Sequence, residues 1–312
     1  MKSVFTKLLV IIILILFSNN LQARINNYSS GQIITDYVEV SKKKKLKLPE
    51  GEWEVVERWS SAGHGLKFSV MGLIRVENNE VAEMMEIAYS NLAGAYIKYI
   101  DHALIEIMFK GKHDGCYERP EYYLVELYRK GSTHNCLIID HIDVMKEINN
   151  PDDPQDRDIL ARTKQWLRDN SEVEVPAIML GSFHSYFSRL VGGNWVGLSY
   201  SINPKLLNAP ENNYITEATS EYHKQNIQRF PEHKKIMEQW VSIAAERHLE
   251  FENLSNSKGR HKLKLDKYIL GNKVELGSGD SISDKLKTLN ELYKSGALTK
   301  EEFEKAKKKL LN

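Results

Sequence analysis

The chain has 312 residues, of which 42% are hydrophobic and 27% are charged, so it is long enough for one or two domains with a buried core. These ordinary globular proportions argue against a wholly disordered chain and against a polytopic membrane protein. Lysine and arginine number 43 against 42 acidic residues, a net charge of +1, so no overall field would draw nucleic acid to the protein.

The amino end has the order of a secretory signal peptide. Lys2 and Lys7 form a short basic region, an unbroken apolar run follows at residues 8–17, and a polar stretch then ends in the small residue Ala23. The apolar run is shorter than the roughly 20 residues that a membrane-spanning helix needs. We therefore predict a signal peptide at residues 1–23 and a periplasmic or secreted mature protein. The alternative is an uncleaved inner-membrane signal anchor.

Residues 24–48 are polar and end in a lysine-rich run, with five lysines at the six positions from Lys42 to Lys47. Runs of like charge are typical of solvated, flexible segments, so we predict a linker here. The alternative is a contact with an anionic membrane or polymer, to which each lysine would contribute about 1 kcal/mol.

The main domain is predicted to span residues 49–254, with its strands mostly before its helices. Apolar alternation between turn residues places strands at 53–59, 66–76, 122–128, 137–144, 176–188 and 194–202, with a turn at 77–80. Residues 81–89 are either another strand or the start of a helix. Helical spacing is found at 158–169, at 216–230 and in the segment that Pro231 begins. This order predicts an α+β fold, in which C-terminal helices cover an antiparallel β-sheet.

The two cysteines, Cys116 and Cys136, both lie in the mature part of the chain. In an oxidising compartment a disulfide between them is the default expectation. The predicted hairpin opposes it, because Cys136 falls near the turn and Cys116 lies beyond the far end of the first strand. The connecting loop must then fold back to bring the thiols together, and Pro120 permits such a reversal. The pairing is therefore left open.

Two short pairs of residues could instead hold a zinc ion: His113 with Cys116, and His134 with Cys136. Two imidazoles and two thiolates suit tetrahedral Zn²⁺. Their spacing is not a known zinc pattern, however, and a disulfide would use the same sulfur atoms. We therefore expect the protein to bind neither a metal ion nor a cofactor.

The main domain lacks the sequence motifs of the common catalytic classes, such as a nucleophile elbow, a zinc-protease helix or a phosphate-binding glycine loop. Ser182 and His184 share one face of their strand because side chains alternate. A hydrolase also needs an orienting acid and an oxyanion hole, and neither can be identified in the sequence. Polar alternation on a half-exposed strand is the simpler interpretation. His248 lies on an apolar helical stripe and is interpreted as a core histidine.

Residues 283–312 carry the one specific resemblance in the chain. Their apolar spacing, central glycine and following threonine are similar to the SHOCT module, a short C-terminal helical hairpin of bacterial proteins. The matching positions are Leu286, Leu289, Leu292, Gly296, Leu298, Thr299, Glu302, Phe303, Lys307, Leu310 and Leu311. The resemblance implies an interaction or oligomerisation tail, which we place at residues 282–312 after a linker at 255–281. The main domain resembles no family that we can name.

The residues of this tail support a two-helix hairpin independently. Gly296 can end the first helix, and Thr299 with Glu302 forms a capping box that starts the second. The apolar face expected to mediate association consists of Ile282, Leu286, Leu289, Tyr293, Phe303 and Leu310. A hairpin this small falls below the roughly 40 residues usually needed to fold alone, so its apolar face needs another surface.

These features predict an exported, non-enzymatic envelope protein. Its main domain would bind a ligand or partner, and its C-terminal hairpin would mediate self-association or contact with an envelope protein. The lysines from Lys42 to Lys47 offer a further contact with an anionic membrane or polymer, and no nucleic acid partner is expected. The alternatives are a periplasmic hydrolase or metal-dependent enzyme, and a carbohydrate- or peptide-binding module.

Overall fold

A computed structural model of the chain describes residues 24–41, 44–63, 66–91, 116–130, 133–144, 146, 161–188, 195–212, 216–255, 262–269, 300, 303, 304 and 307. It divides into two compact units, Met1–Val274 and Glu275–Asn312, and each is described by itself. The predicted signal peptide and most of the predicted hairpin lie outside the described residues. No described helix is both long and apolar enough to cross a membrane.

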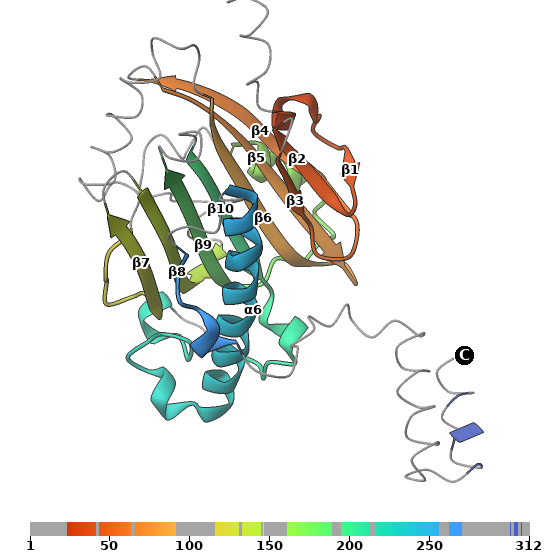
Figure 1. Ribbon diagram of the computed structural model, residues 1–312. Coiled ribbons are helices and arrows are strands. Elements are labelled where there is room, and N and C mark those ends of the chain that lie inside the picture. The colour runs from red at the N-terminus through yellow and green to blue at the C-terminus, as the bar shows by residue number, and fades with distance from the viewer. Residues whose placement is uncertain are drawn as a thin grey trace, which may run out of the picture. The chain divides into compact units, whose positions relative to one another are not determined.

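The first unit is built on an eight-stranded sheet in the order β1-β4-β5-β6-β10-β9-β8-β7 (Figure 1). Its strands are β1 (Ile33–Ile34), β4 (Trp53–Gly63), β5 (Leu66–Glu77), β6 (Glu80–Asn91), β7 (Leu124–Lys130), β8 (Thr133–Asp143), β9 (Ile178–Ser188) and β10 (Trp195–Ile202). All neighbouring strands are antiparallel, which confirms the predicted antiparallel sheet. The sheet consists of two meanders, β4 to β6 and β7 to β10, which meet where β6 pairs with β10.

The turn between β5 and β6 settles the alternative left open for residues 81–89. Asn78 and Asn79 have φ angles of 53° and 58°, the left-handed conformation that a two-residue hairpin turn requires and asparagine tolerates. The chain therefore reverses at once, and β6 pairs with β5 over its length. Residues 81–89 are a strand, and the predicted turn at 77–80 is confirmed.

Two α-helices have described bounds, and they lie on opposite faces of the sheet. The long helix α6 (Pro231–Ser255) packs against β8 and β9 (Figure 1), and we call this side the α6 face. The short helix α5 (Ala161–Asp169) contacts β4 on the other side, the α5 face. The α+β class is confirmed, although one long helix, rather than several, covers the α6 face in the described part of the chain.

Helix α6 packs through the apolar stripe that its sequence predicted. The five stripe residues are all buried: Met237, Val241, Ala244, His248 and Phe251. Trp240 lies against the ring of Tyr200, with centroids 5.5 Å apart, and its Nε1 donates a hydrogen bond of 3.0 Å to the carbonyl oxygen of Gly181. The helix is therefore fixed on the sheet by both apolar and polar contacts.

The predicted helix at residues 216–230 is wrong. The structure has two short 3₁₀ turns there, η4 (Glu217–Thr219) and η5 (Ile227–Arg229). The side chain of Asn226 donates hydrogen bonds of 2.9 and 3.0 Å to the carbonyl oxygens of Ala218 and Ser220. Such side-chain bonds to the backbone compete with helical hydrogen bonding, so an apolar spacing alone did not produce a helix.

The linker predicted at residues 24–48 is also wrong, because most of this segment is folded. It forms the 3₁₀ turn η1 (Arg24–Asn27) and a two-stranded sheet of β2 (Tyr37–Ser41) and β3 (Lys44–Lys47). Its buried residues are Ile25, Ile34, Val38, Val40, Leu46 and Leu48. Burial lowers the pKa of Lys44 to about 8, so this lysine does not belong to a solvated run. The folded domain begins at or before residue 24 rather than at residue 49.

Part of the predicted linker at residues 255–281 is folded as well. Leu263 and Leu265 are buried beside α6, and a 3₁₀ turn, η6 (Asp266–Tyr268), follows them. Lys267 and the hydroxyl of Tyr268 both contact Glu126 of β7, at 2.6 Å each. The first compact unit therefore extends past residue 254.

Candidate functional site

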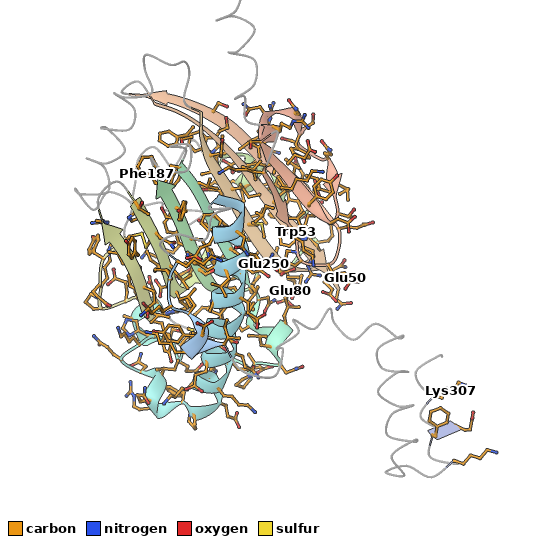
Figure 2. All side chains as sticks on the ribbon, in the orientation of Figure 1. Glu50, Trp53, Glu80, Phe187, Glu250 and Lys307 are labelled. Atoms are coloured by element: carbon orange, nitrogen blue, oxygen red, sulfur yellow. A yellow bond between two sulfur atoms is a disulfide. The ribbon has the colours of Figure 1, made fainter. Side chains whose placement is uncertain are left out.

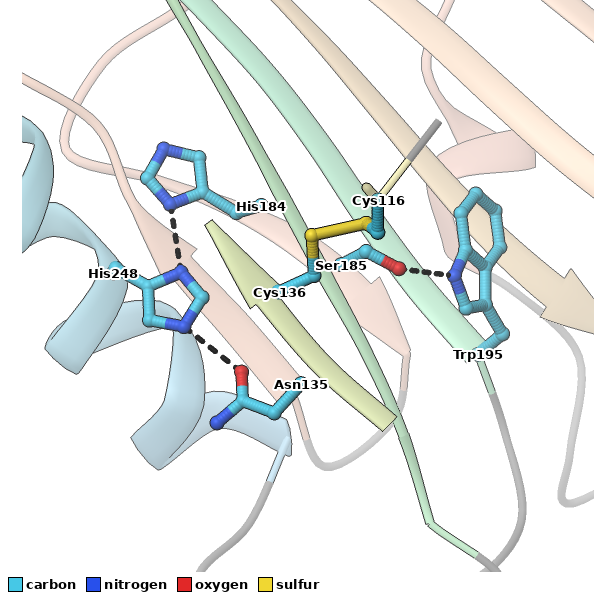
Figure 3. Close-up of a disulfide and its surroundings, with 7 residues drawn as sticks. All are labelled: Cys116, Asn135, Cys136, His184, Ser185, Trp195 and His248. Atoms are coloured by element: carbon cyan, nitrogen blue, oxygen red, sulfur yellow. Dashed lines mark hydrogen bonds between the residues drawn. A yellow bond between two sulfur atoms is a disulfide. The ribbon is translucent and has the colours of Figure 1, made fainter. Parts of the chain in front are cut away.

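Cys116 and Cys136 form a disulfide with a Cα–Cα distance of 6.2 Å (Figure 3), which confirms the pairing left open above. The sequence argument against it assumed that Cys136 lies near a turn. Instead β8 begins at Thr133, and Cys136 pairs with Leu127 inside the hairpin. Both cysteines are fully buried on the α5 face. The bond therefore joins the segment before β7 to the middle of the second meander.

His134 is the third member of this cluster, and its ring nitrogen and the two sulfur atoms all lie within 4.8 Å of one another. Among the described residues, no other group of three potential ligands is this close together. His113, the fourth residue of the predicted zinc set, lies outside the described residues. Because zinc binds thiolates, the disulfide removes both sulfur ligands from the set.

Ser182 and His184 lie on one face of β9 as predicted, and they begin a chain of hydrogen bonds, whose part from His184 through His248 to Asn135 is drawn in Figure 3. Ser182 Oγ is 2.9 Å from His184 Nε2, and His184 Nδ1 is 3.1 Å from His248 Nδ1 on α6. His248 Nε2 is 2.9 Å from Asn135 Oδ1 on β8, and Asn135 Nδ2 donates to Glu252 Oε1 on α6. The sequence identified the first two residues but missed their connection to an acidic group.

The carboxylate at the end of the chain fixes the direction of its hydrogen bonds. A carboxylate only accepts, so Asn135 turns its NH₂ group to Glu252 and its oxygen to His248. Burial lowers the pKa of both histidines, well below the usual value for His184, so both rings are neutral at pH 7. His248 then carries its hydrogen on Nε2 and accepts from Nδ1–H of His184, whose Nε2 lies against the hydroxyl of Ser182.

This chain is closed to solvent. Both histidines, Asn135 and Glu252 have no exposed surface, and Ser182 is 6% exposed. The backbone N–H of Leu263 also donates to Glu252, at 2.8 Å. Because buried polar groups are costly unless paired, the chain stabilises the contact of α6 with β8 and β9. Within the described residues it pairs the side-chain polar atoms of its members except Glu252 Oε2, and it presents no exposed nucleophile.

A second buried polar cluster on the α6 face was not predicted. The guanidinium of Arg75 on β5 contacts Glu83 on β6 and also Glu77, the latter at 2.8 Å. Tyr200 on β10 donates its hydroxyl hydrogen to Glu83. Burial and the neighbouring Glu83 hold the pKa of Tyr200 well above its usual value. The cluster therefore joins the two meanders through a neutral tyrosine and a paired carboxylate.

A cavity of about 440 Å³ lies against the α5 face of the sheet. Apolar side chains from both meanders make up most of its lining: Val56, Ile74, Met84, Ile138, Ile142, Val144 and Phe183. Tyr122 also lines it, from the segment between the disulfide and β7. The lining residue Ser199 is exposed. The cavity thus has a mainly apolar wall.

Three acidic residues also line this cavity, and its described lining contains no lysine, arginine or histidine. Thr163 of α5 donates a hydrogen bond of 2.7 Å to Glu57, which is 4% exposed. Burial raises the pKa of Asp140, although its contacts with His141 oppose the rise. Glu86 on β6 is the third acidic residue. The cavity therefore combines an apolar wall with a few polar groups, as ligand sites do.

In the second unit, four residues are described. Phe303 belongs to a helical segment, and the ammonium of Lys307 lies 5.8 Å from the centre of its ring. The other predicted residues of the association face lie outside the described residues. The identity of this segment follows from its match to a protein-family model.

Residues 284–311 match the family model of the Short C-terminal domain, SHOCT. The match covers the segment in which the sequence pattern resembles this module, and it confirms that resemblance. No curated protein and no solved structure matches the chain. The SHOCT segment is compatible with an association role, while the function of the first unit must be inferred from its own geometry.

Proposed function

We propose that the protein is an exported, non-enzymatic binding protein. It holds a small, largely apolar molecule in the cavity on the α5 face, and its SHOCT segment mediates association. The cavity is the observation that carries this proposal, because its volume of about 440 Å³ falls within the roughly 300–1,000 Å³ typical of small-molecule sites. The apolar wall supplies affinity, and the acidic groups orient the ligand.

The neutral dye Nile red tests the cavity directly. Its fluorescence should rise on binding to the full chain. Ser199→Phe places a ring in the lining of the cavity and should abolish that rise. Ser60→Phe, at an exposed position of β4 outside the lining, is the matched control and should leave binding unchanged. Equal dye binding by both variants, or no binding by the unaltered chain, would contradict the proposed site.

Export is supported by the disulfide, since disulfides persist in oxidising compartments and are rare in the cytosol. It is also compatible with the folded segment that begins at Arg24, whose guanidinium contacts Glu39 of β2. Cleavage after Ala23 would leave every described contact intact. The mass of the mature protein from its native host should therefore correspond to a chain starting at Arg24, and a cytosolic, full-length product would refute export.

Association through the SHOCT segment is tested by size-exclusion chromatography with light scattering. The full chain should form a complex that a chain ending at residue 281 does not form. Nile red binding should be the same for both, because the cavity belongs to the first unit. Identical masses, together with unchanged partner or membrane association, would refute this part of the proposal.

The hydrolase alternative has two observations in its favour: Ser182 is connected to a carboxylate through two histidines and Asn135, and it is among the residues that line the α5-face cavity. Its hydroxyl faces α6, however, where it lies 2.9 Å from His184 Nε2 and 3.2 Å from the carbonyl oxygen of Tyr200. A nucleophile must reach its substrate, and this hydroxyl is enclosed. A fluorophosphonate probe should therefore not label the protein. Labelling that disappears in Ser182→Ala would establish the hydrolase instead.

A further inference from the structure

A second cavity, of about 360 Å³, lies at one end of the sheet and shares no lining residue with the first. It is formed by the first residues of β6 and β9, by the 3₁₀ turn η3 (Pro204–Leu207), by the segment 209–212 and by Tyr222. Glu80, labelled in Figure 2, marks its position at the start of β6. The proposed function does not use this cavity.

Two residues that line this cavity hold buried polar atoms without a hydrogen-bond partner in the described structure. They are the amide nitrogen and oxygen of Asn212 and the hydroxyl of Tyr222, whose side chain is 1% exposed. An unpaired buried polar group costs about 1–3 kcal/mol, and such groups are uncommon in folded proteins. Three unpaired polar atoms at a single cavity indicate that something else pairs with them.

Three other polar residues of this lining are already paired, and the fourth, Glu211, is exposed. Asn203 donates to the carbonyl oxygen of Val81 at 3.3 Å, and its own side-chain oxygen accepts from the backbone N–H of Lys205 at 3.0 Å. The ammonium of Lys205 contacts both carboxylate oxygens of Glu80 at 2.9 Å. Lys205 is the one basic residue of the described lining, and its charge is neutralised by Glu80, while Glu211 would repel an anion. The cavity therefore favours a neutral occupant that forms hydrogen bonds with Asn212 and Tyr222.

We propose that this cavity binds a neutral planar molecule with an N–H donor and an acceptor side by side on one edge. The amide of Asn212 offers one acceptor and one donor on the same side, and asparagine pairs with the edge of a nucleobase in this way. A trans peptide bond points its N–H and C=O in opposite directions, so an ordinary peptide cannot satisfy both atoms. The ligand class is therefore a primary carboxamide, a lactam or a nucleobase.

The shape of the lining agrees with a planar ligand. Three prolines contribute rigid apolar surface beside the polar groups: Pro176, Pro204 and Pro210. The hydroxyl of Tyr222 adds a third polar group, which can donate or accept. A planar ring with one hydrogen-bonding edge can contact both the apolar and the polar part of such a lining.

Uridine and nicotinamide are the probes, tested with the full chain by isothermal titration calorimetry. Uridine carries one lactam N–H, at N3, and 3-methyluridine lacks it. We expect at least one probe to bind, and its methylated counterpart (3-methyluridine or N,N-dimethylnicotinamide) to bind at least about tenfold more weakly, since an unpaired buried group costs 1–3 kcal/mol. Asn212→Asp, which replaces the donor by an acceptor, should weaken binding to a similar extent. Failure of both probes, or equal affinity of the variant, would overturn the proposal.

Urea unfolding of the free protein gives an independent test. Tyr222→Phe removes a hydroxyl that has no hydrogen-bond partner among the described residues, so it should weaken probe binding without lowering the unfolding midpoint. Tyr200→Phe is the matched control, because that hydroxyl is equally buried but donates to Glu83, and its loss should lower the midpoint. If Tyr222→Phe lowers the midpoint as much as Tyr200→Phe, the hydroxyl has a permanent partner such as an ordered water, and the proposal fails.

Discussion

The two buried histidines between β9 and α6 should make the stability of the protein depend on pH just below neutrality. His184 and His248 have no exposed surface, and burial lowers the pKa of each. In the unfolded chain each would take up a proton near its ordinary pKa of about 6.5. The unfolded state therefore binds more protons as the pH falls below this value, and the free energy of unfolding decreases.

The size of the effect follows from the number of rings. One histidine that is neutral when folded and charged when unfolded contributes up to about 1.4 kcal/mol per pH unit, so two contribute at most about 2.7 kcal/mol per pH unit. Glu252 opposes the lowered pKa of His248, while Arg247 adds to the lowering at His184. The loss begins near pH 6.5 and continues down to the folded-state pKa values. Asp140, whose pKa is raised, contributes with the opposite sign at lower pH.

Urea unfolding of the oxidised, full-length protein, followed by circular dichroism at pH 7.5, 6.5, 6.0 and 5.5, measures this slope. His248→Gln keeps an N–H donor for Asn135 but removes one titrating ring, so the slope between pH 6.0 and 5.5 should fall by about half. A stability that is constant over this range, or a slope that is unchanged in the variant, would show that the rings are not held neutral.

Three further variants test other parts of the first unit. Replacing Cys116 and Cys136 by serine opens a loop with a sequence separation of 20, which should lower the free energy of unfolding in urea by about 3 kcal/mol; a loss below 1 kcal/mol would contradict this. Gly197→Ala places a Cβ atom 2.6 Å from the ring of Trp195, so a loss of about 1–3 kcal/mol and a changed near-ultraviolet spectrum of that indole are expected; an unaltered spectrum would refute the clash. Glu83→Gln leaves its buried arginine partner with one carboxylate instead of two and should lower the free energy of unfolding by about 3 kcal/mol. Urea unfolding at pH 7.5 measures this loss, and an unchanged stability would contradict it.

The sheet was predictable because strand signals are local. Alternation and turn residues located most of the strands, and the asparagine pair at the β5–β6 turn explains why 81–89 could not be a helix. The segment 24–48 was misjudged because its lysines outweighed a real alternation in β2, in which Val38 and Val40 are buried and their neighbours are not. A run of lysines can therefore occur in a strand as well as in a linker.

The buried polar chain was only half predictable. Ser182 and His184 lie two residues apart, so strand geometry alone places them together. Asn135 and Glu252 are 117 residues apart in sequence, and nothing local indicates that they meet. The two cavities were not predictable at all, because each is lined by several elements that meet only in the folded chain.

The meeting of the two meanders has a consequence for how the protein folds and binds. The two meanders meet where β6 pairs with β10, and we call this pairing the seam. Across it, Ser90 and Trp195 form hydrogen bonds although they are 105 residues apart. Because forming the seam orders a long loop, this step of folding is expected to be slow. The cavity on the α5 face is lined by residues of β6 and β10, on both sides of the seam. A ligand there binds only the completed sheet and stabilises it by mass action. Ligand supply and the closing of the seam are thus thermodynamically linked.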